Sequence, residues 1–473
     1  MVKSSTVYIC QNCEAKYSKW QGQCDNCGEW GTLVETLAQS ETKSKKMNAL
    51  NRPLEEQVVK FSQVKTAKGQ ITRLSTGIGE LDRVLGPGIG QKTDNGIVPG
   101  SVMLIGGEPG IGKSTLLTQM ILTMLNIADN THPKKIIYVC GEESPQQISI
   151  RIKRILENED NNNQVKFGKD LVKILGSSLI FCQLVNVDQV VGIIEKERPD
   201  LVIVDSIQTM TTDELTGAAG SAGQLRESTD RLTTIAKAYH IPMFLVGHVT
   251  KEGAIAGPKI LEHIVDTVLE LSGERTDDLR ILRTLKNRFG PTDEVGVFRV
   301  SEAGLEEISN PSQIFLEHTD LEVPGTATVC VMEGTRPLLV EVQALVVDSQ
   351  LAMPRRVGRG IELSRIQVLS AILQKHCGLP LGMSDIFLSV AGGFKVKEPA
   401  VDLGLAMAIV GSLKNKSLPN KTIFIGEIGL LGEIRSVSHL DRRIKEAKRL
   451  GYDQVISRKT HQSVKDVLSE FKM

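Results

Sequence analysis

The sequence has no net charge, because its 473 residues include 56 Lys and Arg against 56 Asp and Glu. A nucleic-acid partner therefore cannot be inferred from overall charge, and such binding would have to use local basic patches. The longest apolar runs are far shorter than the roughly 20 residues that span a bilayer. The N-terminus also lacks the apolar core of a signal peptide. We expect a soluble, cytoplasmic protein with no membrane contact.

Cysteine is scarce, and half of the cysteine residues stand singly along the chain instead of in pairs. Four of the eight cysteines stand singly in apolar sequence, which predicts buried free thiols in a reducing compartment. These are Cys140, Cys182, Cys330 and Cys377. The sequence shows no internal repeat and no long low-complexity tract. Its length exceeds one compact core and 41% of its residues are apolar, so two or three domains are expected.

The other four cysteines form two C-x-x-C pairs separated by ten residues: Cys10 with Cys13, and Cys24 with Cys27. Four thiolates suit tetrahedral Zn²⁺. A segment of about 35 residues cannot fold on apolar burial alone, and the metal would supply on the order of 10 kcal/mol. Two redox-active pairs are the weaker alternative, because no βαβ pattern surrounds them. A closed four-cysteine site has no open position, so we assign it a structural or interaction role.

The strongest motif is G-x-x-x-x-G-K-[ST], which runs from Gly107 to Ser114. An apolar strand-like run at 101–105 precedes it and a helical pattern follows, as a phosphate-binding loop requires. Glycines let backbone N–H groups turn toward phosphates at a helix N-terminus. Lys113 would reach the β- and γ-phosphates of ATP, and Ser114 would hold Mg²⁺. The predicted ATP-binding residues are Gly107, Glu108, Pro109, Gly110, Ile111, Gly112, Lys113, Ser114 and Thr115.

Polar residues that follow three later apolar strands complete an ATPase pattern. Asp205 ends the run 201–204, where a carboxylate can hold Mg²⁺ through water. Glu142 and Glu143 follow the run 136–140, where a carboxylate can orient and activate the attacking water. His248 follows the run 243–246 and would sense the γ-phosphate. Taken alone, each acid is more often a solvated charge and a lone histidine is usually structural, but in this order they form a coherent set.

Basic residues mark three further segments. Two Gly- and Ala-rich loops, 216–224 and 251–259, follow strands, and the second bears Lys251 and Lys259. Loops of this type often carry function. Lys286 and Arg288 occupy alternate positions of a predicted strand, so their side chains share one face. Such a pair can reach the ATP of a neighbouring subunit.

The domain order follows from these patterns. We predict a Cys₄ zinc ribbon at 1–35, a polar linker at 36–60, an ATPase domain at 61–309 and a further domain at 310–473. Strands and helices alternate through the ATPase segment, which argues for an α/β fold with a mostly parallel sheet and helices on both faces. The last segment mixes α and β elements.

The segments 247–253 and 286–290, together with the ribbon, resemble the bacterial RadA (Sms) family of DNA repair proteins over essentially the whole chain. The Lys-Asn-Arg-Phe-Gly motif at 286–290 is highly specific to that family. The resemblance implies a RecA-like core, a hexameric ring related to DnaB-type helicases, and ATP-driven movement on single-stranded DNA. It implies that Lys286 and Arg288 act across a subunit boundary and that both Gly- and Ala-rich loops face the DNA channel.

The same resemblance implies a role in recombinational repair. The expected activity is a DNA-dependent ATPase that promotes branch migration of recombination intermediates. The expected cofactors are Zn²⁺ and Mg²⁺, with ATP as the nucleotide. The expected partners are single-stranded and branched DNA, a RecA-type recombinase, and further copies of the chain.

The C-terminal segment resembles the protease domain of Lon through 392–402 and 425–435. Ala400 stands where Lon enzymes have their serine nucleophile, and Asp441 falls about where the lysine would be. Without a nucleophile and an amine base the acyl chemistry is absent. We therefore expect an α+β scaffold that helps to build the ring. Its densest basic cluster consists of Arg355, Arg356, Arg359 and Arg365. There are three alternatives for these arginines: they bind DNA, they form salt bridges at a subunit boundary, or they are simply solvated.

A second function of a different class uses the same fold. A protein-regulating ATPase, such as a clock-type kinase or a zinc-ribbon adaptor, would hydrolyse ATP without moving along DNA. Stimulation of ATP hydrolysis by single-stranded DNA separates the two. A third function, an ATP-dependent protease, is disfavoured by Ala400.

Overall fold

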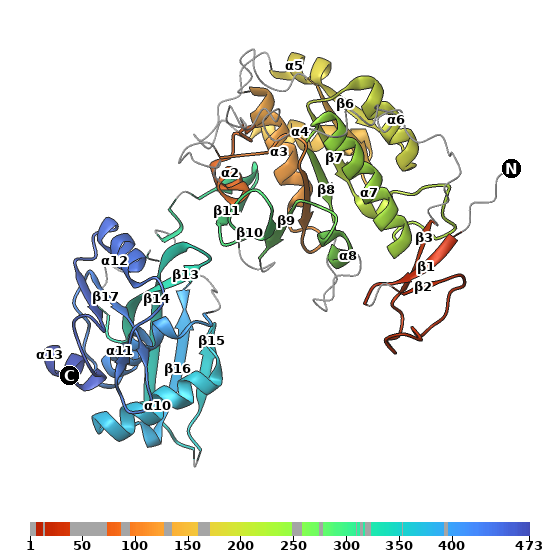
Figure 1. Ribbon diagram of the computed structural model, residues 1–473. Helices are drawn as coiled ribbons and strands as arrows, with labels where there is room; N and C mark the ends of the chain where they lie inside the picture. Colours follow the sequence, from red (N-terminus) through yellow and green to blue (C-terminus); the bar gives the residue numbers. More distant parts are fainter. Residues whose placement is uncertain are drawn as a thin grey trace, which may run out of the picture. The chain divides into compact units, whose positions relative to one another are not determined.

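The chain forms two compact units, Met1–Ile308 and Ser309–Met473, shown in a computed structural model (Figure 1). Both units mix helices and strands, which confirms the predicted α/β class. The structure describes residues 6–12, 15–37, 73–86, 95–126, 135–158, 171–247, 258–273, 278–308, 310–312, 316, 323–351, 353–391 and 396–473. No helix in these ranges is both long and apolar enough to cross a bilayer.

The N-terminal ribbon is a three-stranded antiparallel sheet in the order β2-β1-β3. Its strands are β1 (Thr6–Cys10), β2 (Lys16–Tyr17) and β3 (Leu33–Leu37). The buried core of this sheet consists of Cys10, Cys24 and Leu33, with tyrosine rings packed against it. Because so few apolar side chains are buried, the ribbon needs a further source of stability.

A nine-stranded sheet forms the centre of the first unit, in the order β12-β11-β10-β9-β4-β8-β7-β5-β6. The strands from β9 to β6 run parallel, and β10, β11 and β12 continue the sheet antiparallel. The strands are β4 (Val102–Gly106), β5 (Ile136–Cys140), β6 (Leu179–Cys182), β7 (Leu201–Asp205), β8 (Met243–Val246), β9 (Thr267–Ser272), β10 (Leu279–Asn287), β11 (Val295–Ser301) and β12 (Gly304–Glu307).

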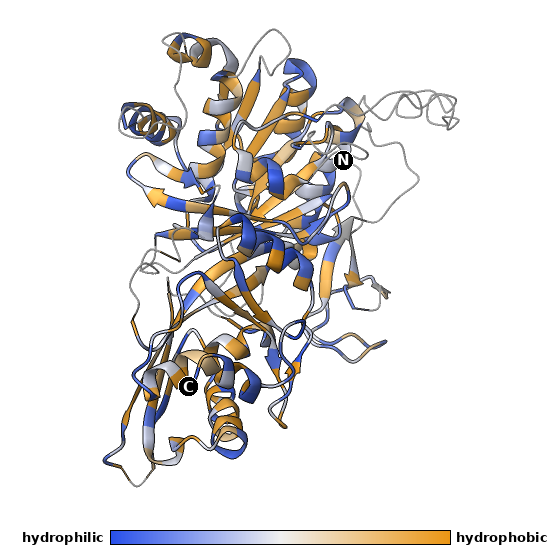
Figure 2. Cartoon of the chain, turned by 90° about the vertical axis from the view of Figure 1, so that its left-hand side faces the viewer, coloured by the Kyte–Doolittle hydropathy of each residue, from blue (hydrophilic) through white to orange (hydrophobic). Residues whose placement is uncertain are grey.

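Helices cover both faces of this sheet. Successive side chains of β4 point to opposite faces, so Met103 and Ile105 join one core while Val102 and Leu104 join the other. Strands covered on both faces are apolar along their whole length, as Figure 2 shows for the parallel strands. The helices are α2 (Gly79–Leu85), α3 (Lys113–Asn126), α4 (Pro145–Glu157), α5 (Leu171–Ser178), α6 (Val187–Glu197), α7 (Ala222–Tyr239) and α8 (Pro258–Glu262), with a 3₁₀ turn η5 (Ile207–Thr209).

The second unit is built on a six-stranded mixed sheet in the order β15-β16-β14-β13-β17-β20. Helix α11 is buried along most of its length because nearly all its residues are apolar. The strands are β13 (Thr326–Glu333), β14 (Arg336–Asp348), β15 (Arg356–Arg359), β16 (Ser384–Val390), β17 (Thr422–Ile425) and β20 (Gln454–Ser457), with a separate pair β18 (Glu427–Ile428) and β19 (Ile434–Arg435). The helices are α10 (Leu363–Cys377), α11 (Asp402–Leu413), α12 (Leu440–Arg449) and α13 (Val464–Glu470), with 3₁₀ turns η6 (Leu381–Met383) and η8 (Pro399–Val401).

The scattered cysteines are free thiols, as predicted. Cys140, Cys182 and Cys330 are buried, and Cys377 is half-buried. Burial raises the pKa of Cys140 and that of Cys330 to about 12, so both remain protonated at neutral pH. These thiols therefore act as small apolar side chains.

A buried ion pair joins α12 to the segment before η8. The Arg443 side chain is fully buried, and its Nη2 and Nη1 donate to the two carboxylate oxygens of Glu398 at 2.6 and 3.0 Å. Its Nε donates to the Ser438 carbonyl at 3.0 Å. A buried charge that loses its partner is strongly destabilising. The pair therefore fixes the position of α12 in the second unit.

We expect Glu398→Ala to destabilise the second unit by about 3–5 kcal/mol, because Arg443 would stay buried without a counter-charge. Hydrogen exchange of the β13 amides in the intact chain measures this. The matched control is Glu446→Ala, which breaks an exposed pair with Arg449 on the same helix and should cost less than about 1 kcal/mol. Equal protection in the two variants would contradict the role given to the buried pair.

Candidate nucleotide site

The phosphate-binding loop is the turn between β4 and α3. Three of its glycines have positive φ, with values of +153° at Gly107, +77° at Gly110 and +115° at Gly112. At Gly107 an added Cβ would lie 2.4 Å from the Leu271 carbonyl oxygen of β9, so no other residue fits there. This backbone shape is the one that turns successive N–H groups toward an anion. The loop therefore has the geometry that its sequence predicts.

Lys113, the first residue of α3, is almost completely buried. Its ammonium donates to the carbonyl oxygens of Gly107 and Glu108, both at 2.9 Å. Burial lowers the pKa of Lys113, and the negative charges of Asp205 and Glu142 act in the opposite direction. The lysine therefore lies between its own loop and the two carboxylates that the sequence analysis grouped with it.

Asp205 and Glu142 meet because β7 and β5 are parallel neighbours that end at the same edge of the sheet. The backbone N–H groups of Gly141 and Glu142 donate to the Asp205 carbonyl at 2.6 and 3.1 Å. An added Cβ at Gly141 would lie 2.1 Å from the Thr209 hydroxyl, so glycine permits this close contact. The edge of the sheet thus brings together the loop lysine and two of the three predicted acids, Asp205 and Glu142.

The two neighbouring glutamates have different partners. Glu142 accepts a hydrogen bond from the Ser206 hydroxyl, in the segment directly after Asp205. Glu143 instead pairs with the guanidinium of Arg151, which is mostly buried on α4. Glu142 therefore faces the loop lysine and the end of β7, whereas Glu143 is tied to the helix that follows it, α4.

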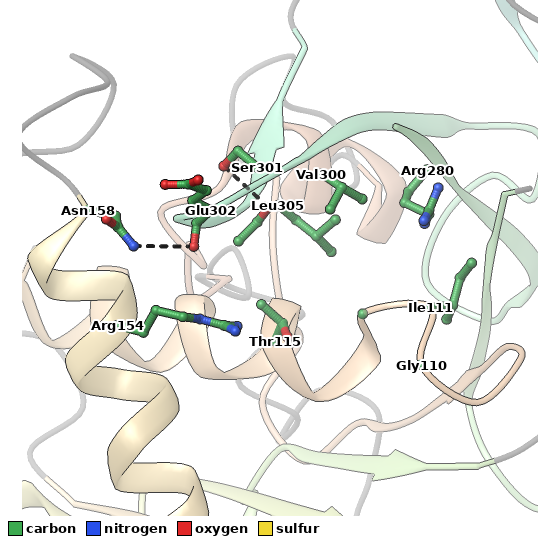
Figure 3. Close-up of a pocket in the computed structure, with 12 residues that line it drawn as sticks. Gly110, Ile111, Thr115, Arg154, Asn158, Arg280, Val300, Ser301, Glu302 and Leu305 are labelled. Atoms are coloured by element: carbon green, nitrogen blue, oxygen red, sulfur yellow. Dashed lines mark hydrogen bonds between the residues drawn. The ribbon is translucent and has the colours of Figure 1, made fainter. Parts of the chain in front are cut away.

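A cavity of about 500 Å³ adjoins the outer side of the loop. Figure 3 shows Arg154 and Asn158 projecting from α4 toward Thr115 and the β11–β12 turn, where the Asn158 amide donates to the Glu302 carbonyl at 3.4 Å. Val300 and Leu305 add apolar surface. No sequence pattern predicts this wall, because its residues come from segments about 150 positions apart. Its size and mixed lining suit a nucleoside.

Lys286 and Arg288 lie at the end of β10, after a bulge between Thr284 and Lys286. Both approach the connection between α8 and β9: Lys286 Nζ donates to the Val265 carbonyl at 2.9 Å, and Arg288 Nη1 lies 3.2 Å from Asp266 Oδ1. Burial and the charge of Arg288 lower the pKa of Lys286. The two cations share one side, as predicted, and neither lines the cavity beside Thr115.

Three thiols of the ribbon converge: the Sγ atoms of Cys10, Cys24 and Cys27 lie within 4.8 Å of one another. The Tyr17 hydroxyl lies 3.3 Å from Cys24 Sγ, and this hydrogen bond lowers the pKa of that thiol. Three converging thiols fit a structural zinc site. The fourth predicted ligand, Cys13, lies outside the described residues.

Three family models match successive parts of the chain. They are a rubredoxin metal binding domain at residues 8–35, an AAA domain at 91–254 and the subunit ChlI of Mg-chelatase at 350–460. The DNA repair protein RadA of Brucella abortus is 42% identical over 459 residues, which are 96% of this chain and 92% of the relative. Those of Aquifex aeolicus and Bacillus subtilis are 42% and 41% identical, again over 96% of this chain and over 94% and 93% of the relatives.

The chain belongs to the RadA family of DNA repair proteins. Its relatives, AAA domain and thiol cluster identify it as an ATP hydrolase of DNA repair that uses Mg²⁺ and Zn²⁺. The predicted resemblance to RadA is therefore confirmed.

Sequence reasoning missed Tyr138, which lies in the middle of β5. Its hydroxyl donates to Asp205 Oδ2 at 2.6 Å, and its side chain is completely buried. Burial, together with the charge of Asp205, raises the pKa of Tyr138 well above 10, so the hydroxyl keeps its proton. The sequence signal that could have pointed to this residue is a tyrosine in an otherwise apolar strand of a RadA-type ATPase.

The predicted DNA-binding residues have different surroundings. Arg356 is used within its own unit, because its guanidinium donates to the carbonyls of Ser384 and Leu381. Arg355 and Arg359 are exposed at the edge strand β15. His248 and Lys251 lie outside the described residues, and Lys259 is described only as a backbone position of α8.

The Gly- and Ala-rich segment 216–224 is only partly a loop, because α7 begins at Ala222. The hydroxyl of Thr216, the first residue of this segment, donates to the carboxylate of Glu35 at 3.1 Å. The start of α7 and strand β3 of the ribbon are therefore in contact.

The Lon-like unit has no nucleophile at Ala400, which is buried in η8. The Asp441 side chain is 88% exposed and pairs with Lys459 on the surface. Arg443, on the next half-turn of α12, points inward to Glu398 instead. A guanidinium that is always protonated cannot act as an amine base, so Arg443 cannot do the chemistry of the Lon lysine.

We expect Glu142→Gln to lower ATP turnover by about 10²- to 10⁴-fold with nucleotide binding retained, because Glu142 is the carboxylate placed to accept a proton from water. Glu143→Gln should lower turnover far less, since Glu143 is already paired with Arg151. Steady-state turnover and binding of a fluorescent ATP analogue test both variants. A larger loss in Glu143→Gln would reverse the two assignments.

Proposed function

We propose that this chain is a ring-forming, DNA-stimulated ATPase motor that acts on single-stranded DNA in recombinational repair and promotes branch migration. The observation that carries the proposal is the placement of Lys286 and Arg288, which stand apart from the nucleotide cavity of their own chain. Cations in that position are free to complete a neighbour's site. The names of the relatives point to DNA repair as the process.

Within one subunit, the loop N–H groups and Lys113 bind the phosphates of ATP. Ser114 and Asp205 would hold Mg²⁺, which when bound neutralises charge on the β- and γ-phosphates. The base and ribose enter the cavity beside Thr115, and Glu108, Pro109 and Ile111 complete the loop. The position of the buried Lys113 ammonium supports this arrangement, because the Gly107 and Glu108 carbonyls hold it against the phosphate-binding loop itself.

The hydrolytic step uses Glu142 as the base. Its carboxylate accepts the proton of the attacking water, and the hydrogen bond from Ser206 holds it in place. Glu143 and Arg151 fix the start of α4 beside it. His248 would report the state of the γ-phosphate to the loop that follows β8.

Between subunits, Lys286 and Arg288 stabilise the charge that develops on the neighbour's γ-phosphate. The carbonyls of the α8–β9 connection and Asp266 hold both cations in the free chain. The Arg288 side chain is 48% exposed, so it can exchange its contact with Asp266 for a phosphate. This role requires a closed ring, for which we propose a hexamer.

DNA would be bound by Lys251 and Lys259 in the channel loop and by Arg355 and Arg359 of the Lon-like unit, with Arg356 supporting that edge strand.

We propose the domain boundaries 1–35, 36–60, 61–309 and 310–473 for ribbon, linker, motor and scaffold. Branched recombination intermediates and a RecA-type recombinase are the proposed partners, and the cytoplasm is the proposed location.

Single-stranded DNA should raise ATP turnover, and Lys251→Ala should reduce that rise more than the basal rate. Affinity should fall with salt at a log–log slope near −0.7 per phosphate neutralised. Removing both Arg355 and Arg359 should flatten the slope by about 1.4 units. The matched control is Arg449→Ala, an exposed arginine of the same unit that is paired with Glu446.

Turnover and fluorescence anisotropy with labelled oligonucleotides provide these measurements. Absent stimulation at low ionic strength, with turnover otherwise normal, would favour a protein-regulating ATPase instead.

A further inference from the structure

The Tyr138 side chain is completely buried. Within the described part of the chain, its hydroxyl has one hydrogen-bond partner, the carboxylate of Asp205 at the end of β7. In the parallel pair β5–β7, Tyr138 lies opposite Ile203 and Cys140 lies opposite Asp205. The hydroxyl must therefore reach two residues along the strand, a span of about 7 Å. A tyrosine side chain has this length, whereas serine and threonine do not.

The ring of Tyr138 is itself immobilised. It belongs to the core on the side of the sheet covered by α3 and α4, and it packs edge-on against Phe181 at 6.3 Å between ring centroids. The Tyr138 hydroxyl is therefore a rigid donor. Its acceptor is a carboxylate whose terminal torsion angle is only weakly restricted in aspartate. A hydrogen bond at 2.6 Å on Oδ2 fixes the plane of that carboxylate and leaves Oδ1 for another partner.

We propose that Tyr138 is a positioning residue for magnesium: by holding Asp205 through its hydroxyl, it sets the carboxylate in the orientation that binds the metal of Mg–ATP. The inference rests on the assignment of Asp205 to Mg²⁺ made above. Because Tyr138 is completely buried, it acts through Asp205. A merely structural hydroxyl would affect folding stability and leave magnesium dependence alone.

The test compares Tyr138→Phe, which removes one oxygen and keeps the ring, with wild type. Turnover is measured against Mg²⁺ concentration at saturating ATP. The half-activating concentration of Mg²⁺ should rise about 10-fold or more, because hydrogen bonds to charged groups are the stronger class. Turnover at saturating Mg²⁺ should stay within about threefold of wild type, since Glu142 and Lys113 are unchanged.

The matched control is Tyr239→Phe. The Tyr239 hydroxyl also donates to a carboxylate, that of Glu195 on α6, at 3.4 Å. Its removal is the same chemical change on the helices α6 and α7 instead of the strands β5 and β7, and the Mg²⁺ curve should not move. A similar shift in both variants would overturn the proposal, as would a wild-type Mg²⁺ curve in Tyr138→Phe, whatever its thermal stability.

A second measurement does not depend on turnover. Binding of a fluorescent ATP analogue with and without Mg²⁺ gives the factor by which the metal strengthens nucleotide affinity. Tyr138→Phe should reduce this factor in the wild-type background and have no effect in Asp205→Asn. Equal effects in both backgrounds would overturn the proposal. Wild-type binding and turnover without any Mg²⁺ dependence would instead remove the assignment of Asp205, on which the proposal rests.

Discussion

The buried carboxylate of Asp205 is the constraint on which the nucleotide site depends. A charge that is almost entirely removed from water must be compensated. Here the Tyr138 hydroxyl contacts it directly, and its negative charge favours the protonated form of Lys113. Its backbone carbonyl also receives two N–H groups from the turn after β5. One residue at the end of one strand thus sets the positions of the loop cation, the candidate base Glu142 and the proposed metal site.

A second buried acid, Asp266, contacts both the loop strand and Arg288 of the cation pair. Its Oδ2 accepts from the backbone N–H of Val102, the first residue of β4, at 3.1 Å. Its Oδ1 faces Arg288. The strand that leads into a subunit's own phosphate loop and the arginine proposed to serve a neighbour are therefore held by one carboxylate.

Features encoded in contiguous sequence could be predicted. The loop from Gly107 to Thr115, the acids after β5 and β7 and the cysteine pairs are local patterns whose spacing carries the chemistry. The choice between Glu142 and Glu143 was hidden, because it depends on which one Arg151 and Ser206 engage. Tyr138 was hidden because a strand buried on both faces gives no periodic signal that separates a functional side chain from a packed one.

Long-range geometry accounts for the remaining differences. The cavity beside Thr115, proposed for the nucleoside, is lined by residues of α4 and of the β11–β12 turn. The sequence of neither segment predicts that the other lies next to it. Asp441 and Arg443 are two positions apart, and only the rotation of α12 decides that the arginine is buried and the aspartate exposed. The sequence does not distinguish Arg356 from its exposed neighbours, because its hydrogen-bond partners are backbone carbonyls of η6 and β16.

The most direct test of the account is whether a site can be completed from two subunits. Arg288→Ala alone should lose about 10³-fold or more in turnover with nucleotide binding intact, and Lys113→Ala alone should also be inactive. Mixed subunits of the two variants, shown to co-assemble, should regain turnover, because some interfaces then join an intact loop to an intact arginine. Co-assembled mixtures that stay inactive would contradict the shared site and place Arg288 within its own chain or on DNA.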